Sequence, residues 1–175
     1  MHNTTAWIAM GTNMPFAGVS GADLLSRARD ALLSEGVSVL RCSGVWQTAA
    51  WPAGTNQPDY FNAVIEADVG DRDPRALFDL LRLVEERFGR ARRERWGART
   101  LDLDIVAMGG LSGFFDGIEL PHPRMAERAF VLAPLAELAP GWPHPGLGRT
   151  AAELLAGLPP AGGYRRISDF QPPAG

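Results

Sequence analysis

The stretch from Gly89 to Ile105 combines dense positive charge with two closely spaced carboxylates. It contains Trp96, ends in Asp102 and Asp104, and holds five arginines: Arg90, Arg92, Arg93, Arg95 and Arg99. Guanidinium groups can neutralise phosphate oxygens, and a pair of carboxylates can hold a hard divalent cation. These residue types in this order indicate chemistry on a polyphosphate that is bound together with a metal ion.

Asp102 and Asp104 are two residues apart in a predicted strand, so both side chains point to one face, about 6–7 Å apart along the backbone. Leu101, Leu103 and Ile105 then point to the opposite face, into the core. Two carboxylates on a central strand are costly unless they are solvated or bind a metal. The motif alone leaves a solvated strand face and a metal pair equally open, and the neighbouring arginines favour the metal pair.

The arginine run also has a plain interpretation, which is a solvated charge run with no specific role. Trp96 argues against it, because a Trp between arginines usually packs on a base or a ring. Glu85 borders the apolar face of the preceding predicted helix, and its spacing favours a helix-flanking charge over a ligand-binding role. His122 is presented between two prolines, but a lone His is more often structural or solvated than catalytic.

The elements expected up to Met108 alternate in a recognisable order. Hydrophobic periodicity and turn signals predict strands at 5–11, 37–46, 60–69 and 101–108, helices at 20–36 and 73–89, and a long loop at 47–59. The order β-α-β-β-α-β is that of the ferredoxin-like α+β fold, an antiparallel sheet with two helices on one face.

The later elements are expected to cover the other face of the sheet, which gives three α/β/α layers. They are a glycine-rich hairpin at 109–117, an extended segment at 120–125, helices at 127–138 and 150–158, and a strand at 164–168. Pro134 is expected to kink or divide the first of these helices. We expect a single domain over 1–175 with a frayed tail from about 169.

Composition excludes several function classes. The net charge is −3, which argues against a global basic field for nucleic acid, and all 17 basic residues are arginines, so no Walker-type lysine exists. The only cysteine, Cys42, excludes an internal disulfide and a multi-cysteine zinc site. Without a signal-like N-terminus or an apolar run of about 18 residues, we expect a cytoplasmic monomer with no membrane or nucleic-acid partner.

The string from Gly89 to Ile105 closely resembles the signature of the 6-hydroxymethyl-7,8-dihydropterin pyrophosphokinase family. Two further blocks support the resemblance: Asn56–Ala63 looks like the family's pterin-side motif, and Leu120–Leu132 looks like its third block. The similarity runs from about Ile8 to Pro140. It implies a ferredoxin-like α+β kinase of tetrahydrofolate biosynthesis that transfers pyrophosphate from ATP to 6-hydroxymethyl-7,8-dihydropterin, using two Mg²⁺ and releasing AMP.

The resemblance also assigns residues to roles. Phosphate contact and catalysis would fall to Arg90, Arg92, Asp102 and Asp104, of which Asp102 and Asp104 would hold both metal ions. ATP would contact Glu85, Arg92, Trp96, Arg99, Ile105, His122 and Arg128. The pterin would contact Thr48, Trp51, Tyr60, Asn62, Trp96 and Phe130, with Tyr60 and Phe130 on either side of the ring. Asp102 could also orient the hydroxyl or take its proton, unless the metals alone suffice.

The sequence departs from the family's usual pattern at loop positions. Ala49 and Ala50 stand where prolines are usual, Trp51 replaces a smaller apolar residue, and Ala98 interrupts the usual Trp-Gly-Pro-Arg. Fewer prolines give an open loop more conformational freedom. Two other function classes remain: a catalytically silent nucleotide- or pterin-binding domain of the same fold, and a ferredoxin-like RNA-binding module, which would need a basic sheet face.

Overall fold

The computed structural model describes residues 4–50, 56–89, 100–159 and 163–170, and its centre is a six-stranded sheet. The strands of this sheet are β1 (Thr5–Thr12), β2 (Ser38–Cys42), β3 (Val45–Thr48), β4 (Tyr60–Asp68), β5 (Asp102–Met108) and β8 (Tyr164–Ser168). Their order is β5-β1-β4-β3-β8, β2 also pairs with β4, and every pairing is antiparallel. The predicted antiparallel sheet is therefore confirmed.

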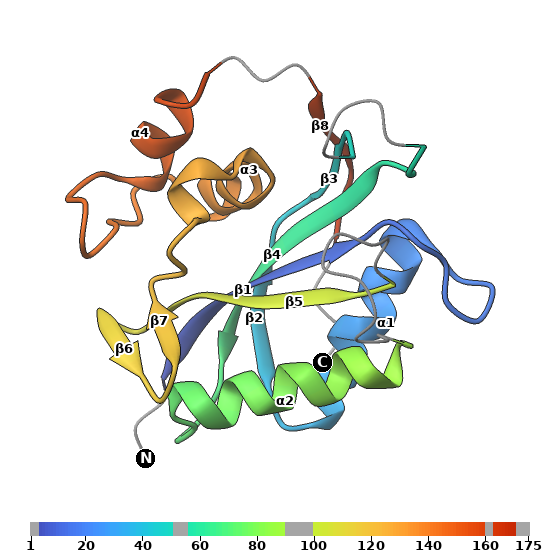
Figure 1. Ribbon diagram of the computed structural model, residues 1–175, viewed down its shortest axis with the longest axis horizontal. Coiled ribbons are helices and arrows are strands. Elements are labelled where there is room, and N and C mark those ends of the chain that lie inside the picture. The colour runs from blue at the N-terminus through green and yellow to red at the C-terminus, as the bar shows by residue number, and fades with distance from the viewer. Residues whose placement is uncertain (1–3, 51–55, 90–99, 160–162, 171–175) are drawn as a thin grey trace.

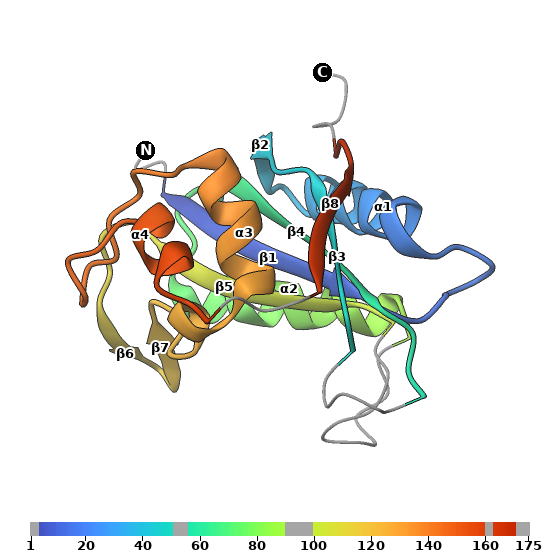
Figure 2. The same ribbon diagram turned by 90° about the horizontal axis from the view of Figure 1, so that it is seen from above.

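Helices cover both faces of the sheet (Figures 1 and 2). One face carries α1 (Gly21–Ser34) and α2 (Pro74–Arg87), and the other carries α3 (Ala129–Leu138) and α4 (Ala151–Ala156). Strand alternation sends Ile8, Ile65 and Leu103 into the core beneath α1 and α2, whereas Trp7 and Val64 enter a second core beneath α3 and α4. No helix within the described ranges is long and apolar enough to cross a membrane.

Helix α2 begins and ends where its sequence predicts. The Asp73 side chain accepts a hydrogen bond from the Ala76 backbone N–H at 2.7 Å, and Pro74 occupies the first turn. Leu77, Leu81 and Val84 form its buried stripe. Gly89 follows the helix with a φ of 78°, a left-handed conformation that favours glycine.

The strand predicted over 37–46 is in fact two strands, β2 and β3, separated at Ser43 and Gly44. The Ser43 hydroxyl accepts a hydrogen bond from the Val64 backbone N–H at 2.9 Å and donates to the Gly44 carbonyl at 2.7 Å, which replaces regular ladder bonds. A Cβ atom at Gly44 would lie 2.5 Å from Nε of Arg166. The break lets β3 turn away from β2 and pair with β8.

The later elements follow the expected order with two differences. A separate 3₁₀ turn at Met125–Glu127 precedes α3. Of the two outcomes predicted for Pro134, a kink or a division, the division is wrong, because Pro134 lies inside the continuous helix α3. The hairpin consists of β6 (Gly113–Phe115) and β7 (Ile118–Leu120), joined by Asp116 and Gly117 with φ of 49° and 83°, as type I′ turns require. Residues 171–175 of the expected frayed tail lie outside the described residues.

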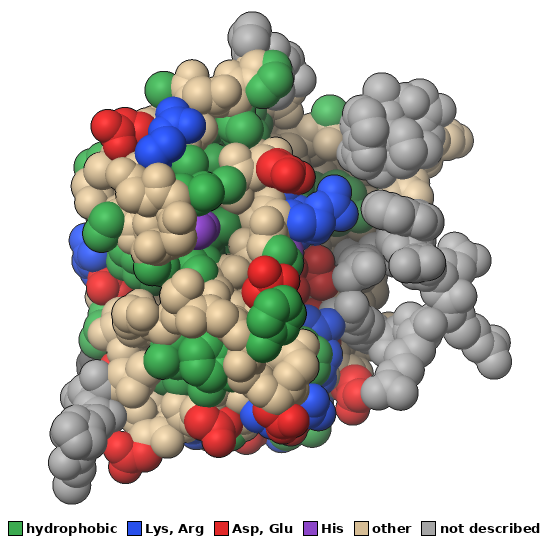
Figure 3. Space-filling model, turned by 60° about the vertical axis from the view of Figure 1, so that its left-hand side comes forward, with side chains coloured by type: hydrophobic (Ala, Val, Ile, Leu, Met, Phe, Trp, Pro, Cys, Tyr) green, Lys and Arg blue, Asp and Glu red, His purple; other side chains and the backbone are tan. Residues whose placement is uncertain are grey.

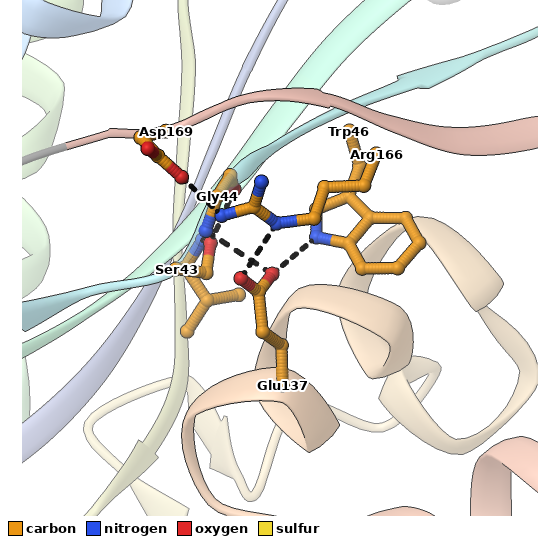
Figure 4. Close-up of polar contacts among 7 residues, drawn as sticks. Ser43, Gly44, Trp46, Glu137, Arg166 and Asp169 are labelled. Atoms are coloured by element: carbon orange, nitrogen blue, oxygen red, sulfur yellow. Dashed lines mark hydrogen bonds and ion pairs between the residues drawn. The ribbon is translucent and has the colours of Figure 1, made fainter.

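Helix α3 is fixed to the sheet by the carboxylate of Glu137 near its C-terminal end (Figure 4). This carboxylate accepts hydrogen bonds from the Gly44 backbone N–H at 3.1 Å and from the indole N–H of Trp46 at 2.8 Å. It also pairs with Nε of Arg166 at 2.8 Å, and the same guanidinium bonds to Asp169. One side chain thus joins α3 to both β3 and β8.

Candidate active site

Asp102 and Asp104 lie on β5, which the sequence analysis took as central but which forms one edge of the sheet. Leu103 is fully buried in the first core, so the two partly buried aspartates face the opposite side, as predicted. The pairing of β5 with β1 shifts register after Ile105, which is the mark of a β-bulge. Ile105 enters the first core with Leu103, and the extra residue of the bulge places both Val106 and Ala107 in the second core.

The two carboxylates form an electrostatically unfavourable pair as they stand. Burial raises the pKa of Asp104 above its usual value, and the negative charge of Asp102 raises it further, against the opposing effects of His122, Arg82 and Arg128. A divalent cation between the carboxylates would relieve both effects. The described residues contain no group of three or more His, Cys, Asp or Glu suited to a metal. Two carboxylates completed by substrate phosphates are, however, a usual way for proteins to hold Mg²⁺.

Glu85 is not the solvated helix-flanking charge that its spacing favoured. Its side chain is fully buried, its Oε1 accepts a hydrogen bond from the Leu103 backbone N–H at 2.7 Å, and its Oε2 pairs with Nη1 of Arg82 at 2.7 Å. Glu85 thus bonds to the residue between the two aspartates. Glu85 therefore has partners on both β5 and α2.

His122 lies close enough to Asp104 for the charges of the two side chains to influence each other's pKa. Its backbone N–H donates to the Val106 carbonyl at 2.8 Å, and its Nδ1 accepts from the Arg124 backbone N–H at 3.2 Å. Burial lowers the pKa of His122, with Arg128 acting in the same direction and Asp104 opposing. The neutral ring therefore carries its proton on Nε2, which remains a potential donor.

His122, Asp104 and Ile105 line one hollow of about 370 Å³ between β5, α2 and the β6–β7 hairpin. Its other walls come from Arg75, Phe78, Phe114, Gly117, Ile118, Glu119 and Pro123. The carboxylate of Asp104 lies among walls that are otherwise largely apolar or aromatic. Such a hollow suits a ligand with a flat apolar ring, and a negatively charged group on that ligand would need a cation between it and Asp104.

Three of the predicted pterin-side residues, Thr48, Tyr60 and Asn62, come together on β3 and β4. Nδ2 of Asn62 donates to the Thr48 hydroxyl at 2.9 Å, and Thr48 pairs with Tyr60 across the two strands. Asn62 is 5% exposed, so its amide is held rigidly in the sheet. Phe130 stands at the start of α3, 38% exposed, with the Arg128 guanidinium 5.4 Å from its ring centroid.

The strand register shows how the aspartate pair on β5 lies relative to the pterin-side residues on β4. Gly11 on β1 pairs with Asn62 on one side and with Asp102 on the other. The amide and the carboxylate are therefore two strands apart, about 10 Å at the usual spacing between strands. A Cβ atom on Gly11 would lie 3.1 Å from Oδ1 of Asn62. Because Gly11 has no side chain, the surface of the sheet between Asn62 and Asp102 is not covered at this position.

Five of the residues named by resemblance, Arg90, Arg92, Trp96, Arg99 and Trp51, lie outside the described residues. On the described surface drawn in Figure 3, which brings the β6–β7 hairpin and α4 forward, basic side chains lie beside acidic ones.

Comparison with known proteins identifies the family. Residues 7–140 match the model for 7,8-dihydro-6-hydroxymethylpterin-pyrophosphokinase (HPPK). The chain belongs to the HPPK family. The resemblance read from the sequence is thereby confirmed.

Curated HPPK relatives differ in how much of their length this chain matches. It is 42% identical over 123 residues to the 2-amino-4-hydroxy-6-hydroxymethyldihydropteridine pyrophosphokinase of Synechocystis, covering 70% of this chain and 62% of that protein. It is 34% identical over 159 residues to the protein of the same name from Methylorubrum extorquens, covering 91% of this chain and 96% of that one.

Solved structures support the HPPK fold. Plasmodium falciparum HPPK-DHPS with pteroate matches with a TM-score of 0.68 at 13% identity, over 89% of this chain and 42% of that chain. The wild-type structure of the same protein matches with a TM-score of 0.66 at 12% identity. At such low identity the likeness concerns the mixed α/β fold alone.

Sequence reasoning missed two residues at the site of this HPPK family member. Arg82, three residues before Glu85 on α2, contacts both Glu85 and Asp104. The i, i+3 spacing of opposite charges was the available signal. Gly11 carried a weaker signal, because a glycine near the end of a strand has many possible reasons.

Proposed function

We propose that this chain transfers pyrophosphate from ATP to 6-hydroxymethyl-7,8-dihydropterin, giving AMP and the pterin diphosphate, as a step of folate biosynthesis. The observation that carries the proposal is the cross-strand register of Asp102, Gly11 and Asn62 on three neighbouring strands. It places the carboxylate pair two strands from an amide that can hydrogen-bond to the edge of a heterocycle. Membership of the HPPK family and the names of the relatives support the same activity.

ATP would occupy the hollow lined by His122, Ile105 and Phe78, with its phosphates towards Asp104. Asp102 and Asp104 would hold two Mg²⁺, which when bound supply charge neutralisation on the phosphate oxygens. Nε2–H of the neutral His122 would donate to a phosphate oxygen, and Arg128 would add positive charge beside it. By resemblance, Glu85, Arg90, Arg92, Trp96 and Arg99 would complete the nucleotide site.

The pterin would lie between Tyr60 on β4 and Phe130 on α3. Asn62, held by Thr48, would bind the polar edge of the ring with its amide, and Trp51 and Trp96 would close the pocket. This placement directs the hydroxymethyl group across Gly11 towards Asp102. Position and charge neutralisation then carry most of the rate, because phosphoryl transfer needs little covalent help from the protein.

The reaction requires the hydroxymethyl oxygen to form a bond to the β-phosphorus of ATP while the bond from that phosphorus to the α–β bridging oxygen breaks. AMP leaves with the bridging oxygen, and the hydroxyl proton passes to a base or to solvent. We propose that Asp102 orients this hydroxyl. A base role for Asp102 would additionally show as a solvent isotope effect that is lost in Asp102→Asn.

The core is proposed to be ferredoxin-like. Support comes from the sheet order, in which β1 lies between β5 and β4, and β4 lies between β1 and the β2–β3 pair. Two helices, α1 and α2, pack on one face of these strands. The strand β8 and the helices α3 and α4 are additions to that core.

The decisive experiment is AMP formation from MgATP and the hydroxymethyl pterin. We expect turnover in the wild type and a loss of kcat of about 10³-fold or more in Asp104→Ala, with pterin affinity nearly unchanged. Asp30→Ala, which removes an exposed carboxylate paired with Arg29, is the matched control and should retain full activity. Binding of both substrates without AMP would instead favour the catalytically silent domain.

A further inference from the structure

Arg82 lies between the buried Glu85 and the carboxylate of Asp104. Its Nη1 pairs with Oε2 of Glu85 at 2.7 Å, and its Nη2 donates to the Leu103 carbonyl at 2.8 Å. The same Nη2 lies 3.5 Å from Oδ1 of Asp104. The guanidinium stands over Phe78, 4.8 Å from the ring centroid. Four neighbours therefore determine where this positive charge sits.

The pair Arg82–Glu85 takes the place of a further strand at the edge of the sheet. Leu103 offers its backbone N–H and carbonyl to that edge, and they are bonded by Glu85 and Arg82 respectively. An unpaired strand edge is otherwise a site of local fraying. Because Leu103 is the residue between Asp102 and Asp104, this arrangement fixes the backbone from which both carboxylates project.

The charge of Arg82 also acts directly on the site. At 3.5 Å from Asp104, its positive charge offsets part of the repulsion between the two aspartates. The same charge repels an incoming divalent cation. Arg82 should therefore help to hold Asp104 in place and at the same time weaken the binding of a divalent cation there.

We propose that Arg82 is a positioning residue for the Asp102–Asp104 pair. It holds the two carboxylates in a fixed geometry, and its positive charge lowers their affinity for a cation. The inference rests on the proposed function, since it takes the pair to be a metal site. It assigns α2 a role in phosphoryl transfer through a side chain that holds the carboxylates in place.

The test compares Arg82→Gln and Arg82→Lys with the wild type. Gln removes the charge and keeps one amide nitrogen as a hydrogen-bond donor. Lys keeps the charge but lacks the planar guanidinium, which bonds to Glu85 and Leu103 at the same time. Arg87→Gln is the matched control, because Arg87 is on the same helix and pairs with Glu35 away from β5. The measurements are Mn²⁺ binding by electron paramagnetic resonance with a non-hydrolysable ATP analogue, kcat, pterin KM and thermal stability.

For Arg82→Gln we expect Mn²⁺ to bind roughly three- to tenfold more tightly, because a nearby like charge is removed. We also expect kcat to fall about tenfold or more, with pterin KM within about twofold of the wild type. Arg82→Lys should bind Mn²⁺ with near-normal affinity and turn over at an intermediate rate. Arg87→Gln should match the wild type in both.

A purely structural role would lower the melting temperature of Arg82→Gln and leave Mn²⁺ affinity and kcat unchanged, which would overturn the proposal. If Arg82→Gln does not fold, Arg82→Lys decides: near-normal Mn²⁺ affinity with reduced kcat supports the proposal, and unchanged kcat refutes it. A wild type that forms no AMP would refute the proposed function, whereas the Mn²⁺ affinities of the variants would still test the effect of Arg82 on the aspartate pair.

Discussion

Gly11 occupies the point of the sheet at which a side chain would collide with Asn62. A Cβ atom there would lie 3.1 Å from Oδ1 of Asn62, closer than most real contacts, so the amide would have to move. We expect Gly11→Ala to raise pterin KM about threefold or more and to leave ATP KM nearly unchanged, because a small displacement of a binding group costs affinity. Steady-state kinetics with each substrate varied in turn measure both constants.

The control for this substitution is Gly110→Ala. A Cβ atom at Gly110 would meet nothing within 4 Å, and its φ is not in the left-handed region. This variant should behave as the wild type. An unchanged pterin KM in Gly11→Ala would show that Asn62 does not read the pterin from its present position.

Cys42 is partly buried against the first core, and its burial suppresses thiol chemistry. Burial raises the pKa of the Cys42 thiol from 9.0 to about 11, although the charge of Arg29 acts in the opposite direction. The thiolate fraction at pH 8, and with it the alkylation rate, should be roughly a hundredfold below that of an ordinary thiol. Because the folded state disfavours the thiolate, the free energy of unfolding should also decline as pH rises above the pKa that the Cys42 thiol has in the unfolded chain.

Iodoacetamide labelling followed by mass spectrometry measures this rate, and the same protein in urea supplies the unprotected reference. Equal rates in the folded and unfolded states would show that the thiol is not protected by the fold.

At the scale of single residues, the sequence predicts that the Asp102 and Asp104 side chains share one face of a strand, and the structure confirms this orientation. Residue type alone left their role open, and the roles expected of Asp102, Asp104 and Asn62 come from the resemblance. Glu85 and Arg82 could not be assigned in the same way. Their roles depend on α2 lying against the open edge of β5, and that placement is a property of the tertiary structure.

The N-terminal ends of α1 and α4 differ in whether a side chain caps the helix. Ser20 and Asp23 resemble a capping box before α1, but Ser20 makes no side-chain cap bond. Thr150 and Glu153 form a complete box at α4: the Thr150 hydroxyl accepts from the Glu153 backbone N–H at 3.2 Å, and Glu153 accepts from the Thr150 backbone N–H at 2.8 Å. Glu reaches back where the shorter Asp does not, as the capping box requires.

We therefore expect Thr150→Val to lower the free energy of unfolding by about 1 kcal/mol at pH 7, because it removes the cap hydroxyl. The hydrogen bond from the Thr150 backbone N–H lowers the pKa of Glu153, and the Thr150 hydroxyl acts in the same direction. A lowered carboxyl pKa contributes stability above the unfolded pKa and loses it as pH falls through the folded pKa. The difference in unfolding free energy between variant and wild type should therefore be smaller at an acidic pH, at which Glu153 is protonated in both the folded and the unfolded state, than at pH 7.

Urea denaturation at both pH values tests this expectation. Ser20→Ala is the control, since Ser20 has no side-chain cap bond to lose. A loss in Ser20→Ala as large as that in Thr150→Val would show that capping is not the cause.

At the scale of elements, strands and helices with their own local signals were predicted within one or two residues. Helix α2 has an N-cap, a proline in its first turn and a terminal glycine, so its limits are set locally. The break between β2 and β3 could not be predicted, because it depends on Ser43 bonding to Val64 on β4. Continuity of α3 through Pro134 likewise depends on its burial in the second core.

At the scale of the whole molecule, the two faces of the sheet support different parts of the proposed reaction. Helix α2 lies on one face and reaches around the edge of β5 to Asp104, whereas α3 lies on the other and carries Phe130 at its start. The proposed substrates would meet between these elements, across β1. The position of α3 relative to β4 would therefore matter to the proposed pterin site, and Glu137 at the far end of α3 helps to fix that position (Figure 4).

Replacing Glu137 with Gln should test this long-range effect. A single amide oxygen cannot serve Gly44, Trp46 and Arg166 together, and the ion pair at 2.8 Å is lost. We expect a loss of about 1 kcal/mol in unfolding free energy, since partly exposed donors lose a charged acceptor. Phe130 lies about 10 Å along the helix from Glu137. A small tilt of α3 should therefore raise pterin KM about threefold while ATP KM stays nearly constant.

Thermal unfolding and substrate-specific KM values measure the two effects separately. Asp169→Asn is the matched control, because it removes only the second and more exposed partner of Arg166 and leaves Glu137 in place. If Glu137→Gln lowers stability without changing pterin KM, Glu137 stabilises the fold but does not set the pterin wall. If Glu137→Gln changes both stability and pterin KM, and Asp169→Asn changes neither, then Glu137 at the C-terminal end of α3 sets the position of Phe130 at its N-terminal end.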